Sequence, residues 1–519
     1  MARILKLALL VLAVIVLTVL VVRAFDARRS PALQPWHTYV PKEMRATELD
    51  AADWAAYLKA EDQVFEAVRA NVSFAPDPGG KSTPNRYDRT SPIYPPRFAH
   101  DWNRSFVLEP AGKPAGAVVL VHGLTDAPYS LRHVANRYRE RGFVVIGIRM
   151  PGHGTVPAGL TAAKWEDWQA ATRLAVREAR RRTDPAAPLH LVGYSNGGAL
   201  VTKYALDALE NTTLARPDRI VLISPMIGVT RFARFASVAG WPALLPAFSA
   251  AAWLDIVPEF NPFKYNSFPV NAARQSHRLT AALQEQIGRL ANEGRLADIA
   301  PILTFQSVVD FTVSTPAILH ALYAFLPANG SEMVVFDVNR SVNFSPLLRT
   351  SADTALARLT PATPQAFAFT VVGNSGADAA ATLARTTRAG ETTQVTRALA
   401  LPYPPQVYSL SHLALPMPID DSLYGLEPVP GVEFGANLGA LAVRGERGAL
   451  VVNMDFLTRL ASNPFFPYIL ERIEEGIDRP AVRAAPAAAG ASPAPRPRLP
   501  DKSQFDEFAD TLSPSEGAP

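Results

Sequence analysis

The chain contains no cysteine among its 519 residues. This absence excludes disulfide bonds, thiolate metal sites and a cysteine nucleophile. It leaves the compartment open, because a chain without cysteine is stable in oxidising and reducing surroundings alike. Histidine and carboxylate residues show no cluster at metal-ligand spacing either, so we expect no metal ion and no organic cofactor.

The sequence also lacks any block of five or six like charges. Its 51 basic and 47 acidic side chains nearly balance and leave a net charge of +4. Proteins that bind nucleic acid usually carry a concentrated basic surface, so we do not expect a nucleic-acid partner. Hydrophobic residues make up 48% of the chain, which is enough for a large buried core.

One long hydrophobic run is present, at the N-terminus. Residues 7–22 are apolar except for one threonine, and basic residues stand on both sides of them. A membrane-spanning helix needs about 17–25 apolar residues, so we predict a single-pass anchor over residues 1–25. A cleaved signal peptide is the alternative, although residues 23–26 form a poor cleavage site. The flanking charges do not decide the orientation; we expect the catalytic part on the extracytoplasmic side.

Short apolar runs alternate with longer helical patterns from about residue 105 onward. Continuous apolar runs are typical of strands that are buried on both faces. Their alternation with helices indicates the α/β class, a mostly parallel sheet with helices on both faces. The predicted strands cover residues 115–121, 143–148, 189–193, 219–224 and 302–309, and the predicted helices cover residues 130–142, 165–182 and 196–209.

Residues 193–197 read Gly-Tyr-Ser-Asn-Gly and match the G-x-S-x-G motif. The motif directly follows one predicted strand and opens a predicted helix, which is the setting of a nucleophile elbow. Small residues are needed there because the strand and helix backbones pass closely at a strained turn. Ser195 is therefore the predicted nucleophile. A second candidate, Ser375, lacks the second spaced glycine, and we interpret it as part of an ordinary turn.

A second element of the predicted site is the sequence His122-Gly123-Leu124, which ends the first buried strand. In enzymes with a nucleophile elbow, the loop after this strand supplies one amide of the oxyanion hole, and the residue after the nucleophile supplies the other. This places the backbone N–H groups of Leu124 and Asn196 in the predicted oxyanion hole. His122 precedes the nucleophile in the chain, so we assign it a structural role.

The general base is expected after the nucleophile and the acid in chain order. Only three histidines follow Ser195. His277 lies in a polar part of a helical segment, and His320 lies inside a predicted helix. His412 instead follows a short strand and precedes a proline-containing loop. A loop at the carboxyl edge of the sheet is where the base is needed, so we predict His412.

The acid is expected at the end of the strand that precedes the base. Asp310 directly follows the apolar run of residues 302–309. Its carboxylate would orient the imidazole and stabilise its protonated form. Asp337 is the alternative, but apolar residues flank it on both sides, as in the middle or edge of a strand. We therefore predict Asp310 as the acid.

These motifs together resemble the α/β-hydrolases that are grouped with monoacylglycerol lipases, lysophospholipases and the serine aminopeptidase (S33) hydrolases. The resemblance covers about residues 105–345 and 401–425. It implies the α/β-hydrolase fold, a triad of Ser195, Asp310 and His412, and a cap inserted between the fourth and fifth strands. The residues that carry it, in the family's order, are His122-Gly123, Pro151-Gly152-His153-Gly154, residues 193–198, Asp310 with Val313, and Ser411-His412.

The remaining segments complete the predicted organisation. The C-terminal tail is rich in Ala, Pro and Ser and too poor in large apolar residues to pack, so we expect it to be disordered. A second insertion, rich in Ala and Thr, has no role that the pattern reveals. The predicted divisions are a transmembrane anchor (1–25), a linker and N-terminal helical region (26–104), the first part of the core (105–229), a cap (230–300), the second part of the core (301–478) with an insertion at about 345–400, and the tail (479–519).

The expected function is that of a membrane-anchored serine hydrolase. It would cleave carboxylic, lipid-like esters with an apolar acyl chain through an acyl-enzyme intermediate. One alternative is a peptidase or amidase of the serine aminopeptidase type, in which Asp255 or Glu259 of the cap would bind a charged amine. The other is a catalytically silent envelope protein that serves in interactions.

Overall fold

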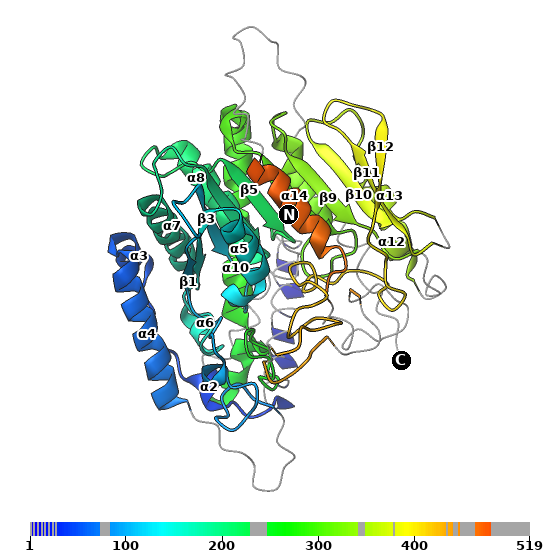
Figure 1. The fold of residues 1–519 in the computed structure, drawn as a ribbon. Coiled ribbons are helices and arrows are strands. Elements are labelled where there is room, and N and C mark those ends of the chain that lie inside the picture. Colours follow the sequence, from blue (N-terminus) through cyan, green and yellow to red (C-terminus); the bar gives the residue numbers. More distant parts are fainter. Residues whose placement is uncertain are drawn as a thin grey trace.

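The structure is a computed structural model with one ten-stranded sheet at its centre (Figure 1). It describes scattered positions before residue 29 and then residues 29–72, 84–228, 246–340, 348–376, 379–431, 434–439, 445–446 and 462–478. The strands, in their order across the sheet, are β1 (Phe106–Leu108), β3 (Phe143–Ile148), β2 (Gly116–Val121), β4 (Leu189–Tyr194), β5 (Arg219–Ile223), β8 (Ile302–Ser307), β9 (Glu332–Phe336), β10 (Ala368–Asn374), β11 (Thr382–Thr387) and β12 (Gln394–Leu399).

The seven strands from β3 to β10 in this order are parallel to their neighbours. Strands β1, β11 and β12 pair in the antiparallel sense at the two edges. Strands β2, β3, β4 and β8 are buried along their whole length, as their continuous apolar sequences require. The mostly parallel sheet predicted from the sequence is confirmed.

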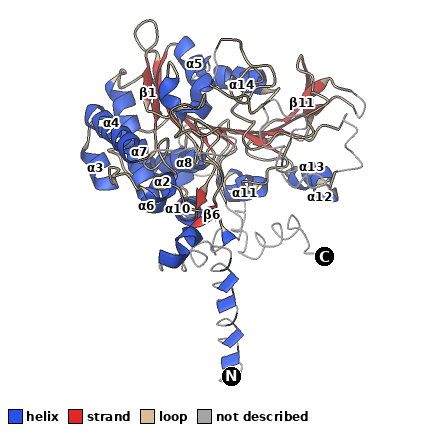
Figure 2. Ribbon diagram, turned by 90° about the horizontal axis from the view of Figure 1, so that it is seen from below, coloured by secondary structure: helices blue, strands red, loops and turns tan. Residues whose placement is uncertain are grey.

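Helices cover both faces of the sheet (Figure 2). Side chains of α7, α8, α10 and α11 pack on one face together with the N-terminal helices, and those of α5 and α14 pack on the other. Successive residues of a strand point to opposite faces, so each of the seven parallel strands contributes to both apolar clusters. The helices are α2 (Pro35–Thr38), α3 (Ala46–Ala51), α4 (Trp54–Asn71), α5 (Arg132–Glu140), α6 (Gly159–Ala162), α7 (Trp165–Arg181), α8 (Asn196–Glu210), α10 (Val270–Asn292), α11 (Thr315–Ala321), α12 (Thr350–Asp353), α13 (Ala355–Leu359) and α14 (Phe466–Asp478), with 3-10 turns η1 (Pro95–Arg97), η2 (Pro128–Leu131), η4 (Pro246–Ala252), η5 (Arg295–Asp298) and η6 (Tyr323–Phe325).

The insertion at about residues 345–400 extends the sheet. Its strand β10 pairs with β9 in parallel, and β11 and β12 follow as antiparallel neighbours. Strand β10 is largely buried, whereas nearly all of β12 is exposed. Toward this new edge of the sheet the sequence alternates only weakly between apolar and polar residues. The sequence pattern therefore did not predict the three strands.

The described part of the expected cap comprises η4, the hairpin of β6 (Trp253–Asp255) and β7 (Phe268–Pro269), α10 and η5; residues 229–245 lie outside the described residues. Helix α10 contacts α6, α7 and α8. Its side chains Leu279, Leu283, Ile287 and Leu290 are fully buried in the same cluster as those core helices. The longest helix of this segment is thus part of the layer that covers the sheet.

The segment expected to be a linker packs on the catalytic domain from about residue 34 onward. Trp36 is buried and stacks on Tyr87 with ring centroids 5.0 Å apart. His37 is also buried, and its Nε2 atom lies 3.0 Å from the hydroxyl of Ser267. Prolines and charges suggested an extended connection, but these aromatic residues bury more apolar surface than a solvated linker would.

A buried ion network fixes this N-terminal region to the end of β3. The guanidinium of Arg149 donates to Glu43 at 2.8 and 2.9 Å and to Glu61 at 3.0 Å. Burial alone would lower the pKa of Arg149, but the neighbouring carboxylates of Glu43 and Glu61 raise it well above its ordinary value. The Arg149 side chain is only 1% exposed, so its charge depends on these partners.

Among the residues that the structure describes, no helix is both long and apolar enough to cross a bilayer. Most of the anchor predicted over residues 1–25, and the whole of the tail predicted over residues 479–519, lie outside the described residues.

We expect Arg149→Met to lower the free energy of unfolding by about 3–5 kcal/mol, because it leaves the buried carboxylates of Glu43 and Glu61 without their cation. Arg173→Met removes a comparable guanidinium from the pair with Asp50, which is 43% exposed, and should cost less than about 1 kcal/mol. Urea unfolding of both variants measures the difference. Equal losses would show that the network around Arg149 does not hold the N-terminal region.

Candidate active site

Ser195 lies at the turn between β4 and α8, in the strained conformation of a nucleophile elbow. Its φ angle is +53°, a value that residues with a side chain rarely adopt. A Cβ atom on Gly197 would collide with the carbonyl group of Val121, and one on Gly193 would meet the backbone of Gly197. The two glycines are thus required by the close passage of strand and helix, as the motif indicated.

The loop after β2 lies against the nucleophile. A Cβ atom on Gly123 would stand 3.2 Å from the Cβ atom of Ser195. The loop continues through Leu124 and Thr125, and the Thr125 carbonyl accepts a hydrogen bond of 2.7 Å from the amide of Tyr265. Asn196 opens α8, where the first backbone N–H groups have no acceptor within the helix. The two predicted oxyanion amides therefore belong to segments that meet at Ser195.

His122 uses both ring nitrogens within the fold. Its Nδ1 atom lies 2.8 Å from the Gly123 carbonyl, and its Nε2 atom accepts the amide of Met150 at 3.0 Å. Burial lowers the pKa of His122 to about 3, so the ring is neutral and holds two loops together. His153 of the glycine loop is likewise buried, and burial lowers its pKa well below the ordinary value. Both histidines have structural positions.

The structure joins Asp310 and His412 directly. Asp310 follows β8 by three residues, and its Oδ2 atom lies 3.0 Å from Nδ1 of His412. The Oδ1 atom accepts the amides of Thr312 and Val313 at 2.8 and 3.0 Å. Burial alone would raise the pKa of Asp310, but the charge and hydrogen bond of His412, with the two amides, lower it below its ordinary value. The buried carboxyl is therefore ionised and oriented toward the imidazole.

Gln306 is a functional neighbour that the sequence analysis missed. Its Nε2 atom donates to Oδ2 of Asp310 at 2.9 Å and to the hydroxyl of Thr315 at 3.0 Å. The side chain is fully buried in β8. A long polar side chain in a fully buried strand, four positions before Asp310, was the signal that could have revealed it.

The alternatives for acid and base lie elsewhere. The carboxylate of Asp337 binds Arg340 at 2.8 Å and accepts the amide of Val338 at 2.9 Å. His320 lies exposed on α11, and His277 lies half-buried on α10. The contacts of Asp337 are those of a structural ion pair at the end of β9.

The long connection between Asp310 and His412 returns to the sheet through Asn339. Its amide donates to the Tyr408 carbonyl at 2.8 Å, and its side chain donates to the carbonyls of Pro404 and Val407 at 3.0 and 2.9 Å. The Tyr194 hydroxyl, beside the nucleophile, donates to the His412 carbonyl at 3.3 Å. The loop that carries His412 is thus tied both to the end of β9 and to the elbow.

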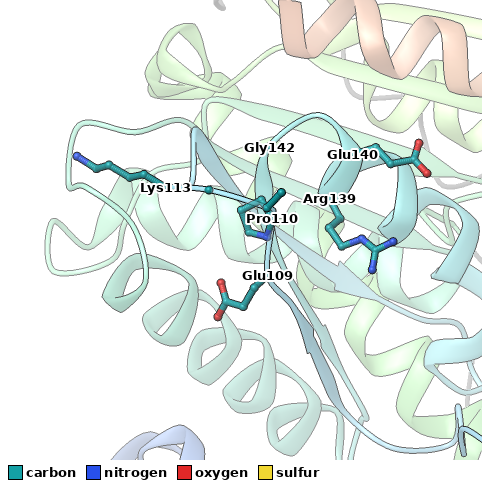
Figure 3. A pocket seen from close by; sticks show the side chains of 8 residues that line it. Glu109, Pro110, Lys113, Arg139, Glu140 and Gly142 are labelled. Carbon is teal, nitrogen blue, oxygen red and sulfur yellow. The ribbon is translucent and has the colours of Figure 1, made fainter.

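The structure also has a shallow depression of about 480 Å³ far from these residues in the topology. Figure 3 shows it between the loop of residues 109–113 and the end of α5, with charged Glu109, Lys113 and Glu140 at its rim. Its residues precede β2 and β3, whereas Ser195 and Asp310 follow their strands. The depression therefore lies at the opposite edge of the parallel sheet and contributes nothing to the site.

No group of three or more histidine and carboxylate side chains within the described ranges is arranged to hold a metal ion.

A family model and several known proteins are similar to part of this chain. Residues 112–338 match the family model described as serine aminopeptidase, S33. A thermostable monoacylglycerol lipase from Bacillus sp. (strain H-257) is 27% identical over 199 residues, which are 38% of this chain and 71% of the lipase. Among solved structures, one from a study of the metagenome-derived lipolytic enzymes LipS and LipT shares 23% identity, with a TM-score of 0.37, over 46% of this chain and 88% of its own. The monoacylglycerol lipase of Paleococcus ferrophilus shares 18% identity, with a TM-score of 0.33, over 45% and 87%.

The strand order and the elbow define the fold class: the chain has the α/β-hydrolase fold. Within that class it is a carboxylesterase- or lipase-like hydrolase, similar to monoacylglycerol lipases, as the sequence predicted.

Proposed function

We propose that the chain hydrolyses carboxylic esters with Ser195 as nucleophile, His412 as general base and Asp310 as the acid that orients it. The observation that carries this proposal is the hydrogen bond between Asp310 and His412, formed on a loop that is tied to the nucleophile elbow. An imidazole held through Nδ1 leaves Nε2 to accept a proton. Ser195 is the nucleophile that the elbow presents to it.

The reaction then proceeds in two halves. The Ser195 hydroxyl attacks the ester carbonyl while Nε2 of His412 takes its proton, and the amides of Leu124 and Asn196 stabilise the oxyanion. The intermediate collapses, His412 returns the proton to the departing alcohol, and an acyl-enzyme remains. Water attacks the acyl group with His412 again as base, which releases the carboxylic acid and restores Ser195. Ionised Asp310 stabilises the imidazolium in both halves.

The contacts of the cap favour an ester over an aminoacyl amide. Glu259, one of the two carboxylates that could bind a charged amine, is fully buried. Its oxygens accept the amides of Asn266 and Ser267 at 2.9 and 2.8 Å. Asp255 lies exposed on β6. The Glu259 carboxylate is therefore engaged in the fold, and an amine-binding role has no support from it.

We further propose that the N-terminus anchors the enzyme to a membrane, with the catalytic domain outside the cytoplasm. Eight large apolar side chains among the described positions before residue 29 are 50–62% exposed. Exposed apolar side chains at this density are costly in water and favourable in a bilayer. They are Leu7, Leu10, Val11, Val14, Leu17, Val21, Val22 and Phe25.

We expect Asp310→Asn to lower kcat by about 10⁴-fold, as loss of the orienting acid does in triad enzymes, with a smaller effect on KM. Asp337→Asn is the matched control, because its carboxylate pairs with Arg340 rather than His412, and its kcat should change little. Steady-state kinetics of both variants on one ester measure kcat and KM. A large effect of Asp337→Asn, with Asp310→Asn active, would contradict the assigned acid.

We expect kcat/KM to rise about fourfold per methylene of a short acyl chain, because burial of a methylene is worth about 0.8 kcal/mol. The rise should end, and then reverse, when the pocket is full. A series of acyl esters measures this, with aminoacyl amides assayed beside them. A flat series, or a preference for the amides, would favour a peptidase.

Ser195→Ala should lose both hydrolysis and labelling by a fluorophosphonate probe.

Removal of residues 1–30 should release an active enzyme from membranes, because the buried contacts of the N-terminal region begin at about residue 34. Fractionation and an ester assay measure the two effects. Removal of residues 1–45 is the comparison: it deletes Trp36 and Glu43 as well, and should lower stability. If the shorter deletion still sediments with membranes, an attachment surface exists within the catalytic domain.

A further inference from the structure

Glu446 is a buried carboxylate next to the loop that carries His412. Its side chain is 1% exposed, and its Oε2 atom accepts the backbone N–H of His412 at 2.6 Å. Glu446 lies 34 residues after His412 in the chain, outside the strands and helices of the hydrolase core. A carboxylate is costly to bury unless it is hydrogen-bonded, and here the partner is the backbone of the proposed base.

The backbone of Glu446 is bound to the same loop. Its amide donates to the Ser409 hydroxyl at 2.7 Å, and its carbonyl accepts the Tyr408 hydroxyl at 3.1 Å. A Cβ atom on the preceding residue, Gly445, would collide with the ring of Tyr408, so glycine permits the close approach. Glu446 therefore contacts three residues of one short segment, and its carboxylate bonds to the residue of that segment with catalytic chemistry.

The position of His412 depends on such contacts because no strand supports it. The bond to Asp310 fixes only the Nδ1 side of the ring. The backbone at His412 is held by the Tyr194 hydroxyl on its carbonyl, at 3.3 Å, and by Glu446 on its amide, at 2.6 Å. The Glu446 bond is therefore the firmer of the two backbone restraints.

We infer that Glu446 is a positioning residue for the reaction: it fixes the backbone of His412 so that the imidazole, held by Asp310, presents Nε2 to Ser195. The inference rests on the proposed role of His412 as base. The property that matters is the length of the Glu446 side chain, here called its reach. This length brings a hydrogen-bond acceptor from the main chain of Glu446 to the amide of His412.

Three substitutions of Glu446 distinguish the effect of its side-chain length from that of its charge, and a fourth variant is the control. Glu446→Gln keeps the length and a carbonyl acceptor, Glu446→Asp keeps the charge but is one methylene shorter, and Glu446→Ala removes both. Glu332→Ala is the matched control, because Glu332 is also a buried carboxylate but bonds to Thr370 and Arg472 at the start of β9. Each is assayed for kcat, KM, fluorophosphonate labelling rate and thermal unfolding.

We expect Glu446→Ala and Glu446→Asp to lower kcat by about 10- to 100-fold, as small displacements of catalytic groups do, with KM little changed. The labelling rate of Ser195 should fall in parallel. Glu446→Gln should stay within about threefold of the wild type. Glu332→Ala should lower the unfolding temperature with little effect on kcat. If Glu446→Ala does not fold, the comparison of Gln with Asp still decides.

The inference is overturned if Glu446→Asp is more active than Glu446→Gln, because charge rather than reach would then matter. It is equally overturned if all Glu446 variants have wild-type kcat, or if they change only KM or thermal stability. His412→Ala keeps the two proposals apart. An active His412→Ala variant refutes the proposed base itself, whereas an inactive one with fully active Glu446 variants refutes the positioning role alone.

Discussion

One hydrogen bond, from Nδ1 of His412 to Oδ2 of Asp310, joins positions 102 residues apart. Between them the chain completes α11 and β9, adds three strands to the sheet and returns. Fixing this long return costs chain entropy, and contacts at several points offset that cost. Asn339 fixes residues 404–408 to the end of β9, Tyr194 contacts the His412 carbonyl, and Gln306 and two amides hold the carboxylate. The geometry of the site follows from these restraints.

The sequence predicted the parts of the fold and the site that have local signals. The elbow at Ser195 is visible because its glycines are needed within five residues. Buried parallel strands are visible because they are apolar throughout. The placement of Asp310 could be reasoned from a strand end and that of His412 from chain order, although the short strand expected before His412 is not formed. The structure brings these two side chains together, while their catalytic roles remain a prediction.

Contacts between distant segments left no such signal. Glu446 contacts the amide of His412, 34 residues earlier, and the two lie near each other only in the folded chain. The strands of the insertion were missed because β12 is exposed and its sequence mixes polar and apolar residues without strong alternation. Residues 34–48 resembled a linker by composition, yet Trp36 is buried, and Glu43 binds an arginine 106 residues further along. Whether residues 34–48 are buried depends on the surface that they pack against, which their own composition does not reveal.

The separation of Tyr194 from His412, 218 residues, also has a consequence for biosynthesis. A chain emerging from the ribosome presents the elbow, with the sheet strands before it, long before the loop that carries His412 has been made. An unfinished chain can therefore bury Ser195 in near-native surroundings while the serine lacks an imidazole to take its proton. On the proposed mechanism, the chain hydrolyses no ester until the segment that carries His412 has been synthesised and packed.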